Sequence, residues 1–180
     1  MAPDTALGQA DPPMPLTVRS RQTSHPVDAW RLRRLVKWAL AGTEPGRPVE
    51  PEAHELGVFL VAEAEMVRIN REHLRHEGPT DVITLDYGGQ AGVAPRPGPL
   101  LGDIFICPGV AEAFAREHGI TWPEEVARYL IHGILHLRGY DDSAPGPRRA
   151  MKREEERLMR LAVESFPLSR LAKGGRVVGR

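Results

Sequence analysis

The chain has 180 residues, 41% of them hydrophobic and 27% charged, which is ordinary for one globular domain. Lys plus Arg and Asp plus Glu both total 24, so the formal net charge of zero gives no general attraction to nucleic acid or membrane. The chain has one cysteine, Cys107, and it has neither a secretory leader nor an apolar run near ~18 residues. These features predict a cytoplasmic protein without a disulfide partner or membrane contact.

The first part of the chain alternates short strands with helices. Residues 1–15 are rich in Pro and Ala, which predicts a disordered N-terminal extension. Apolar and β-branched runs predict strands over residues 16–21 and 55–62. Apolar side chains at helical spacing predict an amphipathic helix over residues 27–40, and residues 63–73 are also expected to be helical.

The second part continues the same alternation. Strands are expected over residues 82–86 and 101–106, separated by a Gly- and Pro-rich loop. Helices are expected over residues 110–118 and 147–164, with the metal-site helix described below between them. The mixture predicts a single α/β or α+β domain around a sheet of about four strands, spanning residues 16–166 and followed by a loose basic tail at 167–180.

Two histidines stand four residues apart on a predicted helix. Thr121 begins a capping-box pattern that opens this helix, and Gly139 ends it. His132 and His136 share one helix face, so both imidazoles can reach one metal ion. The chain then turns and brings Asp142 to the same ion, giving H-x3-H-x5-D. Three ligands that leave one position open are the pattern of a catalytic metal site.

A helical wheel separates these histidines from the core. Apolar residues fill about half of the wheel, and His132 and His136 fall on the other half, beside Glu125 and Tyr129. The alternative, that both histidines are hydrogen-bonded structural residues, is weaker for a pair followed by a helix stop and two aspartates. Gly133 stands where zinc peptidases carry the glutamate of H-E-x-x-H, which argues against a metallopeptidase and suggests close packing there.

Residues 132–142 resemble the signature H-G-x-L-H-L-x-G-Y-D-H of the YbeY family of bacterial rRNA maturation endoribonucleases. Three further blocks resemble this family and follow its order between about residues 16 and 165. They are the N-x9-T-D-V-L-S-F segment at Asn70 and Thr80 to Thr84, the G-D-I-x-I strand at residues 102–106, and the M-x3-E-x2-L spacing at Met151, Glu155 and Leu158.

The resemblance implies a zincin-like single domain with a small mixed sheet, flanking helices and one bound zinc ion. By position, His132, His136 and Asp142 are the implied metal ligands. The implied activity is metal-dependent cleavage of single-stranded RNA in 16S rRNA 3′-end maturation and ribosome quality control, with rRNA and the small ribosomal subunit as partners. The alternative from another functional class is a ribosome-associated assembly factor whose metal is structural.

Two positions depart from the family pattern. The usual third ligand is His, whereas this chain has Asp142, which lowers the net charge of the ligand set by one unit. We therefore expect a less acidic bound water and more tolerance for Mn²⁺ or Fe²⁺. The second departure is Leu74, where the family has an arginine thought to face substrate phosphate; Arg75 is the expected catalytic substitute, with His73 and His76 as alternatives.

Other polar residues near these motifs have two interpretations each. Thr80 and Asp81 either form a turn at the mouth of a strand or support the metal ligands and the substrate. Asp141 is a candidate catalytic residue, either as an alternative ligand or as the partner of a histidine. Arg148 and Arg149 belong to a basic cluster that is either a solvated helix face or a binding site for RNA phosphates.

Overall fold

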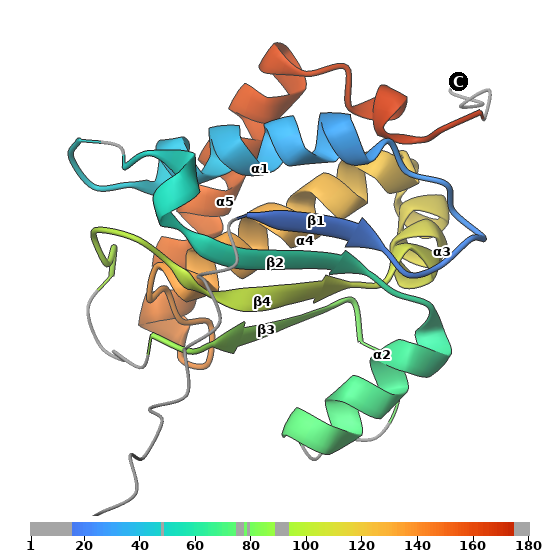
Figure 1. The fold of residues 1–180 in the computed structure, drawn as a ribbon, viewed down its shortest axis with the longest axis horizontal. Coiled ribbons are helices and arrows are strands. Elements are labelled where there is room, and N and C mark those ends of the chain that lie inside the picture. Colours follow the sequence, from blue (N-terminus) through green and yellow to red (C-terminus); the bar gives the residue numbers. More distant parts are fainter. Residues whose placement is uncertain (1–15, 48, 75–77, 79, 89–93, 175–180) are drawn as a thin grey trace, which may run out of the picture.

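The computed structural model describes residues 16–47, 49–74, 78, 80–88 and 94–174. Its centre is a four-stranded mixed sheet with strand order β1-β2-β4-β3 (Figure 1). The first three strands in this order are parallel, and β3 runs antiparallel to β4 at one edge. The strands are β1 (Thr17–Ser20), β2 (Glu55–Leu60), β3 (Val82–Asp86) and β4 (Leu101–Ile106).

In the described part of the chain, five α-helices surround this sheet, which confirms the expected fold class (Figure 1). Helices α1, α4 and α5 lie on one side of the sheet, while α2 lies on the opposite side near β3 (Figure 1). The helices are α1 (Ala29–Thr43), α2 (Glu63–Ile69), α3 (Pro108–His118), α4 (Trp122–Leu137) and α5 (Pro145–Ser165). A π-helical turn, Asn70–Leu74, follows α2, and short 3-10 helices occur at Pro51–Ala53 and Leu168–Leu171.

Helix α4 packs directly on the sheet and carries the two histidines. Its capping box is formed, since the Thr121 backbone N–H donates to Glu124 Oε2 over 2.9 Å. Gly133 is what permits the close approach to the sheet, because a Cβ atom at this position would lie 2.8 Å from Ile104 Cγ2 and 3.1 Å from Thr84 Oγ1. The close packing expected at this glycine is therefore confirmed.

The core extends around more of α4 than the helical wheel predicted. Glu125 and Tyr129, placed outside the core together with the histidines, are only 2% and 6% exposed. The wheel was wrong for these two residues because α3 and α5 also pack against α4 and cover the flanks of its polar side. Burial raises the pKa of both the Glu125 carboxyl and the Tyr129 hydroxyl.

The segment after α5 is partly folded, contrary to the loose tail expected from residue 167. Leu168 and Leu171 are buried in the main core, and Ala172 forms an isolated antiparallel bridge with Val27. The Lys173 backbone N–H also donates to Pro26 O over 2.8 Å. Composition alone missed this segment because only two apolar residues anchor it. The expected N-terminal extension, 1–15, and residues 175–180 lie outside the described residues.

Among the described residues, no helix combines the length and apolar character needed to cross a membrane. The single cysteine, Cys107, is buried at the end of β4, and burial raises the pKa of its thiol. A thiol in that environment is poorly nucleophilic.

Candidate metal centre

The site lies where α4 ends and the chain turns back across its last helical turn. Gly139 adopts a φ of 88°, in the left-handed region that favours glycine. The turn is closed by backbone hydrogen bonds from Gly139 N to His136 O and from Tyr140 N to Leu135 O, 2.8 and 3.0 Å long. This turn brings the carboxylate of Asp142 back toward the histidines.

Three ligand atoms converge at this turn. His132 Nε2 and His136 Nε2 lie 3.0 Å apart, and Asp142 Oδ2 lies 3.8 Å from the first and 4.0 Å from the second. Ligand atoms at about 2.0–2.2 Å from one tetrahedral zinc ion lie roughly 3.3–3.5 Å from each other. The observed distances bracket that value, so small side-chain rotations suffice for all three residues to hold one ion.

The three ligand side chains leave one side of the site accessible. His132 and His136 are about one-quarter exposed, whereas the Asp142 side chain is 48% exposed. Two imidazoles and one carboxylate are a donor set that suits zinc and also divalent iron or manganese. Three protein ligands with solvent access leave a coordination position for water or substrate, which is the arrangement of catalytic rather than structural metal sites.

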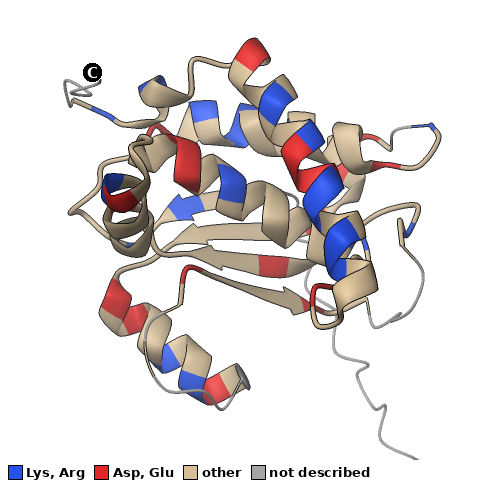
Figure 2. Cartoon of the chain, turned by 180° about the vertical axis from the view of Figure 1, so that it is seen from behind, with Lys and Arg blue, Asp and Glu red and all other residues tan. Residues whose placement is uncertain are grey.

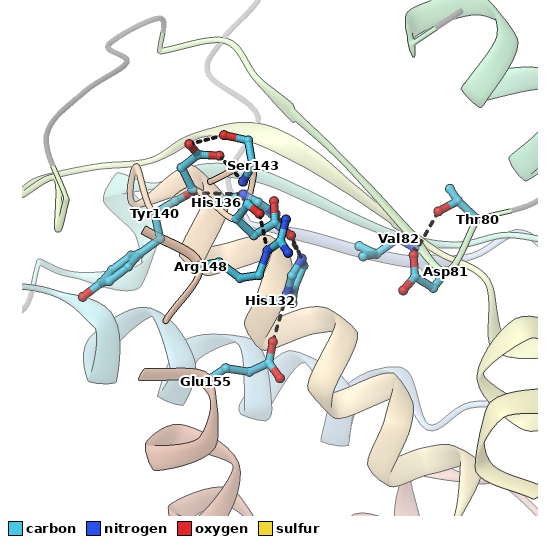
Figure 3. A network of polar contacts seen from close by, with 11 residues as sticks. Thr80, Asp81, Val82, His132, His136, Tyr140, Ser143, Arg148 and Glu155 are labelled. Carbon is cyan, nitrogen blue, oxygen red and sulfur yellow. Dashed lines mark hydrogen bonds and ion pairs between the residues drawn. The ribbon is translucent and has the colours of Figure 1, made fainter. Parts of the chain in front are cut away.

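Each histidine is held through its other ring nitrogen. His132 Nδ1 donates to Glu155 Oε2 over 2.9 Å, and His136 Nδ1 donates to the carbonyl oxygen of Tyr140 over 3.1 Å (Figure 3). Placing the proton on Nδ1 leaves the lone pair of Nε2 free for a metal ion. Glu155 is itself held by Arg128, whose Nη1 donates to Glu155 Oε1 over 2.9 Å.

Glu155 is a site residue that sequence analysis did not assign to the site. It was noted only for its spacing in the last helix of the family. Its contact with His132 joins α4 to α5 across 23 positions of sequence, and no local pattern marks such a pair. The one signal available was that this glutamate falls within a family block.

The ionisation of the site follows from these contacts. Burial alone would lower the pKa of His132, but the hydrogen bond and negative charge of Glu155 raise it above its ordinary value. The same contact lowers the pKa of the Glu155 carboxyl although burial acts to raise it. Burial and the neighbouring His132 lower the pKa of His136, so its imidazole is neutral near pH 7, the form that binds metal.

Asp141 takes part in the turn and is not among the converging ligands. Its Oδ1 accepts from the Ser143 backbone N–H over 2.9 Å, and its Oδ2 accepts from Ser143 Oγ over 2.5 Å (Figure 3). These hydrogen bonds lower the pKa of the Asp141 carboxyl. Asp141 therefore stabilises the loop of residues 139–143, which we call the ligand loop. The carboxylate of Asp142, and not that of Asp141, lies beside the two histidines.

The basic candidates differ from one another in their contacts. Arg148 Nε donates to the backbone oxygen of Asp142 over 2.7 Å, so this arginine holds the ligand loop (Figure 3). Arg149 is exposed on α5. Figure 2 shows Lys and Arg positions along this helix. Arg75 lies outside the described residues, so its expected catalytic role remains a prediction.

Thr80 and Asp81 lie at the start of β3. Thr80 Oγ1 donates to Asp81 Oδ1 over 2.9 Å, and the Val82 backbone N–H donates to the same oxygen over 2.8 Å (Figure 3). These contacts fit the interpretation as a turn at the mouth of a strand. The charge of Asp81 also contributes to the raised pKa of His132, so its carboxylate lies within electrostatic range of the metal ligands.

A family model described as Endoribonuclease YbeY matches residues 17–162. The chain belongs to the YbeY family. A relative from Bordetella parapertussis, named Endoribonuclease YbeY, is 40% identical over 143 residues, covering 79% of this chain and 82% of the relative. The protein of the same name from Frankia alni is 34% identical over 152 residues, covering 81% of each chain. Membership confirms the resemblance seen in the sequence.

The chain is also similar to solved structures. A solution structure from Thermotoga maritima aligns with a TM-score of 0.49 and 23% sequence identity, covering 89% of this chain and 99% of that one.

Proposed function

We propose that the protein is a zinc-dependent endoribonuclease of the cytoplasm that cleaves single-stranded RNA, with rRNA of the small ribosomal subunit as its substrate in 16S 3′-end maturation and ribosome quality control. One observation supports the metal dependence above all: the ligand atoms of His132, His136 and Asp142 converge beside solvent, with one side accessible. Zinc is favoured by the two imidazoles, and Mn²⁺ and Fe²⁺ are alternatives because the third ligand is a carboxylate.

A bound divalent ion would supply a Lewis acid that polarises a phosphate oxygen or activates a water molecule. The protein contributes the geometry around it. His132 and His136 present Nε2 because Glu155 and the Tyr140 carbonyl hold their Nδ1 protons. Arg148 holds the backbone of Asp142 by donating to its carbonyl oxygen, which leaves the Asp142 carboxylate free to face the histidines.

The basic face of α5 suits an RNA backbone. Arg149, Lys152 and Arg153 are exposed on α5 and follow Arg148, the residue that holds the ligand loop, in the sequence. Cations at this place neutralise phosphates on either side of the cleaved bond and make binding depend on salt concentration. We assign Arg75 the role of stabilising the charge that develops on the phosphate. We assign Thr80 and Asp81 to substrate binding on the side of the site opposite to α5.

The alternative is a ribosome-associated assembly factor with a structural metal. It is disfavoured because the named relatives are endoribonucleases and because the ligand cluster lies open at the surface. In a structural zinc site four protein ligands normally close the coordination sphere. Here, among the residues that the structure describes, only three ligand side chains converge.

Cleavage of RNA by the purified protein tests the proposal. The protein is stripped with a chelator, reloaded with zinc, and given matched single-stranded and duplex RNA. We expect cleavage of the single strand alone, and its loss in His136→Ala with the fold retained. His118→Ala, at an exposed histidine on α3, is the matched control. If His136→Ala folds and still cleaves, the site is wrongly assigned; if it unfolds, the metal is structural.

A further inference from the structure

Arg138 is the largest fully buried side chain among the described residues, with 0% of its surface exposed. It directly follows the last residue of α4 and stands between the ligands His136 and Asp142. Its guanidinium forms an ion pair with Glu44 at 2.5 Å, and Glu44 is itself only 3% exposed. The family signature quoted above leaves this position open, so the motif assigns Arg138 no role.

A second arginine faces Arg138 from the segment that precedes β4. Arg138 Nη1 donates to Arg96 O over 3.0 Å and to Gly98 O over 2.7 Å. In return, the Arg96 backbone N–H donates to Arg138 O over 2.7 Å, and Arg96 Nη2 donates to Leu137 O over 2.5 Å. Residues 94–100 and the end of α4 therefore hold each other through both backbone and side chains.

Two acids anchor this arrangement at its ends. Arg96 forms an ion pair with Asp86 at the end of β3, with Nη1 and Oδ2 3.0 Å apart. Glu44 follows α1, and its Oε1 also accepts from the Gly98 backbone N–H over 2.8 Å. We call the set of Arg96, Arg138, Glu44 and Asp86 the arginine clamp. It ties the end of α4 to α1, to β3 and to the segment before β4.

The clamp acts on the backbone where the ligand loop begins. The last carbonyl groups of a helix lack partners within the helix. Here the carbonyl oxygens of Leu137 and Arg138 are bound by Arg96, so the direction in which the chain leaves α4 is fixed from outside the helix. Gly139 and Tyr140 then complete the turn toward Asp142.

We propose that the arginine clamp positions the metal site, by fixing the exit of the chain from α4 so that Asp142 meets His132 and His136. The proposal rests on the metal site assigned above. Stability alone explains the clamp poorly, because a buried ion pair is often no more stabilising than apolar side chains of similar volume. An apolar side chain at position 96 would leave Leu137 O unbound, and one at position 138 would release the Arg96 and Gly98 carbonyl oxygens that hold Arg96 against the end of α4.

The test compares metal binding with fold stability in the full chain. Arg138→Met removes the charge and hydrogen bonds while keeping an unbranched side chain. We expect its zinc affinity, measured by chelator competition, to fall about tenfold, the effect typical of losing a residue that orients a metal ligand. The visible spectrum of the Co²⁺-loaded protein should also change, because Asp142 no longer completes the ligand set.

A core variant separates positioning from general destabilisation. Leu35→Ala removes a fully buried side chain of α1 that is not a member of the clamp, so it lowers stability and leaves all four clamp side chains unchanged. We expect its zinc affinity to stay within about twofold of the unchanged protein and its Co²⁺ spectrum to be unaltered. The proposal is overturned if Arg138→Met keeps the zinc affinity of the unchanged protein. It is also overturned if Leu35→Ala, at an equal loss of thermal stability, loses as much zinc affinity as Arg138→Met.

Asp86→Asn decides the case if Arg138→Met does not fold. Asp86 is partly exposed at the far end of the clamp, and removing its charge leaves Arg138 and Glu44 paired. We expect a smaller but measurable fall in zinc affinity, and no change would overturn the proposal. A protein that binds zinc tightly but does not cleave RNA would refute the proposed function and leave the clamp standing, so the two failures are distinct.

Discussion

Glu155 on α5 accepts a hydrogen bond from His132 on α4 at 2.9 Å, and this contact joins the metal ligand to the last helix of the fold. A carboxylate behind a ligating imidazole fixes its tautomer and increases its basicity. The pairing of helices α4 and α5 is thus part of the chemistry of the site as well as of its stability. This relationship leads to the first prediction.

Replacing Glu155 by Gln should weaken zinc binding by about tenfold. Gln keeps the size of the side chain but removes the charge that raises the pKa of His132. The pKa of His132 in the metal-free protein should therefore fall, as followed by NMR titration of the imidazole. Glu156→Gln, at the exposed neighbouring residue, is the control and should change neither quantity. An unchanged His132 titration in Glu155→Gln would contradict the assigned pairing.

Replacing Asp142 by His should shift the metal preference toward zinc. A neutral ligand removes one negative charge from the set, so the pH at which cleavage reaches half its maximum should fall. Activity with Mn²⁺ should fall relative to activity with zinc, since imidazole suits zinc better than manganese. The measurement is a pH–rate profile with each metal. Equal zinc activity of both proteins at every pH would rule out this role for the carboxylate.

Replacing Gly133 by Ala should destabilise the protein by about 1–3 kcal/mol, the usual range for overpacking a close-packed core. Alanine is the better helix former by about 1 kcal/mol, but its Cβ would press on Ile104 Cγ2 at 2.8 Å. Gly146→Ala is the control, because nothing lies within 4 Å of a Cβ at that position near the start of α5. Urea denaturation of both variants gives the comparison, and equal stability would contradict the close packing.

Arg148 and Arg149 should respond differently to substitution by Ala. Arg148→Ala removes the hydrogen bond to Asp142 O, so zinc affinity should fall. Arg149→Ala should leave zinc affinity unchanged but lower RNA affinity, with the slope of log affinity against log salt reduced by about one. Chelator competition and salt-dependent RNA binding by an uncleavable analogue measure the two effects. The same pattern in both variants would argue against separate roles for adjacent arginines.

Features that depend on neighbouring residues were predicted well from the sequence. The i, i+4 spacing of His132 and His136, the capping box and the turn at Gly139 are local, and each follows from helix geometry. The strands were also found, because β-branched apolar runs mark them. The ends of elements shifted by a few residues, as α1 continues to Thr43 and α5 begins at Pro145.

Features that depend on distant segments could not be predicted. The burial of Glu125 and Tyr129 required knowing that two further helices flank α4. The role of Arg138 depends on carbonyl groups about forty residues away, at Arg96 and Gly98. Charged side chains are mostly exposed, so no local pattern marks Arg138 as buried. Only the folded chain brings these groups together.

The three proposed metal ligands differ in how firmly they are held. Both histidines stand on a rigid helix with their second nitrogen engaged, whereas Asp142 lies on a loop with nearly half of its side chain in solvent. We expect the carboxylate to detach first when an ion dissociates and to close last when one binds. Exchange kinetics should therefore be governed by the loop, because the helix keeps the two histidines in place throughout. Asp142, the ligand that we expect to detach first, is also the position at which this chain departs from the family signature.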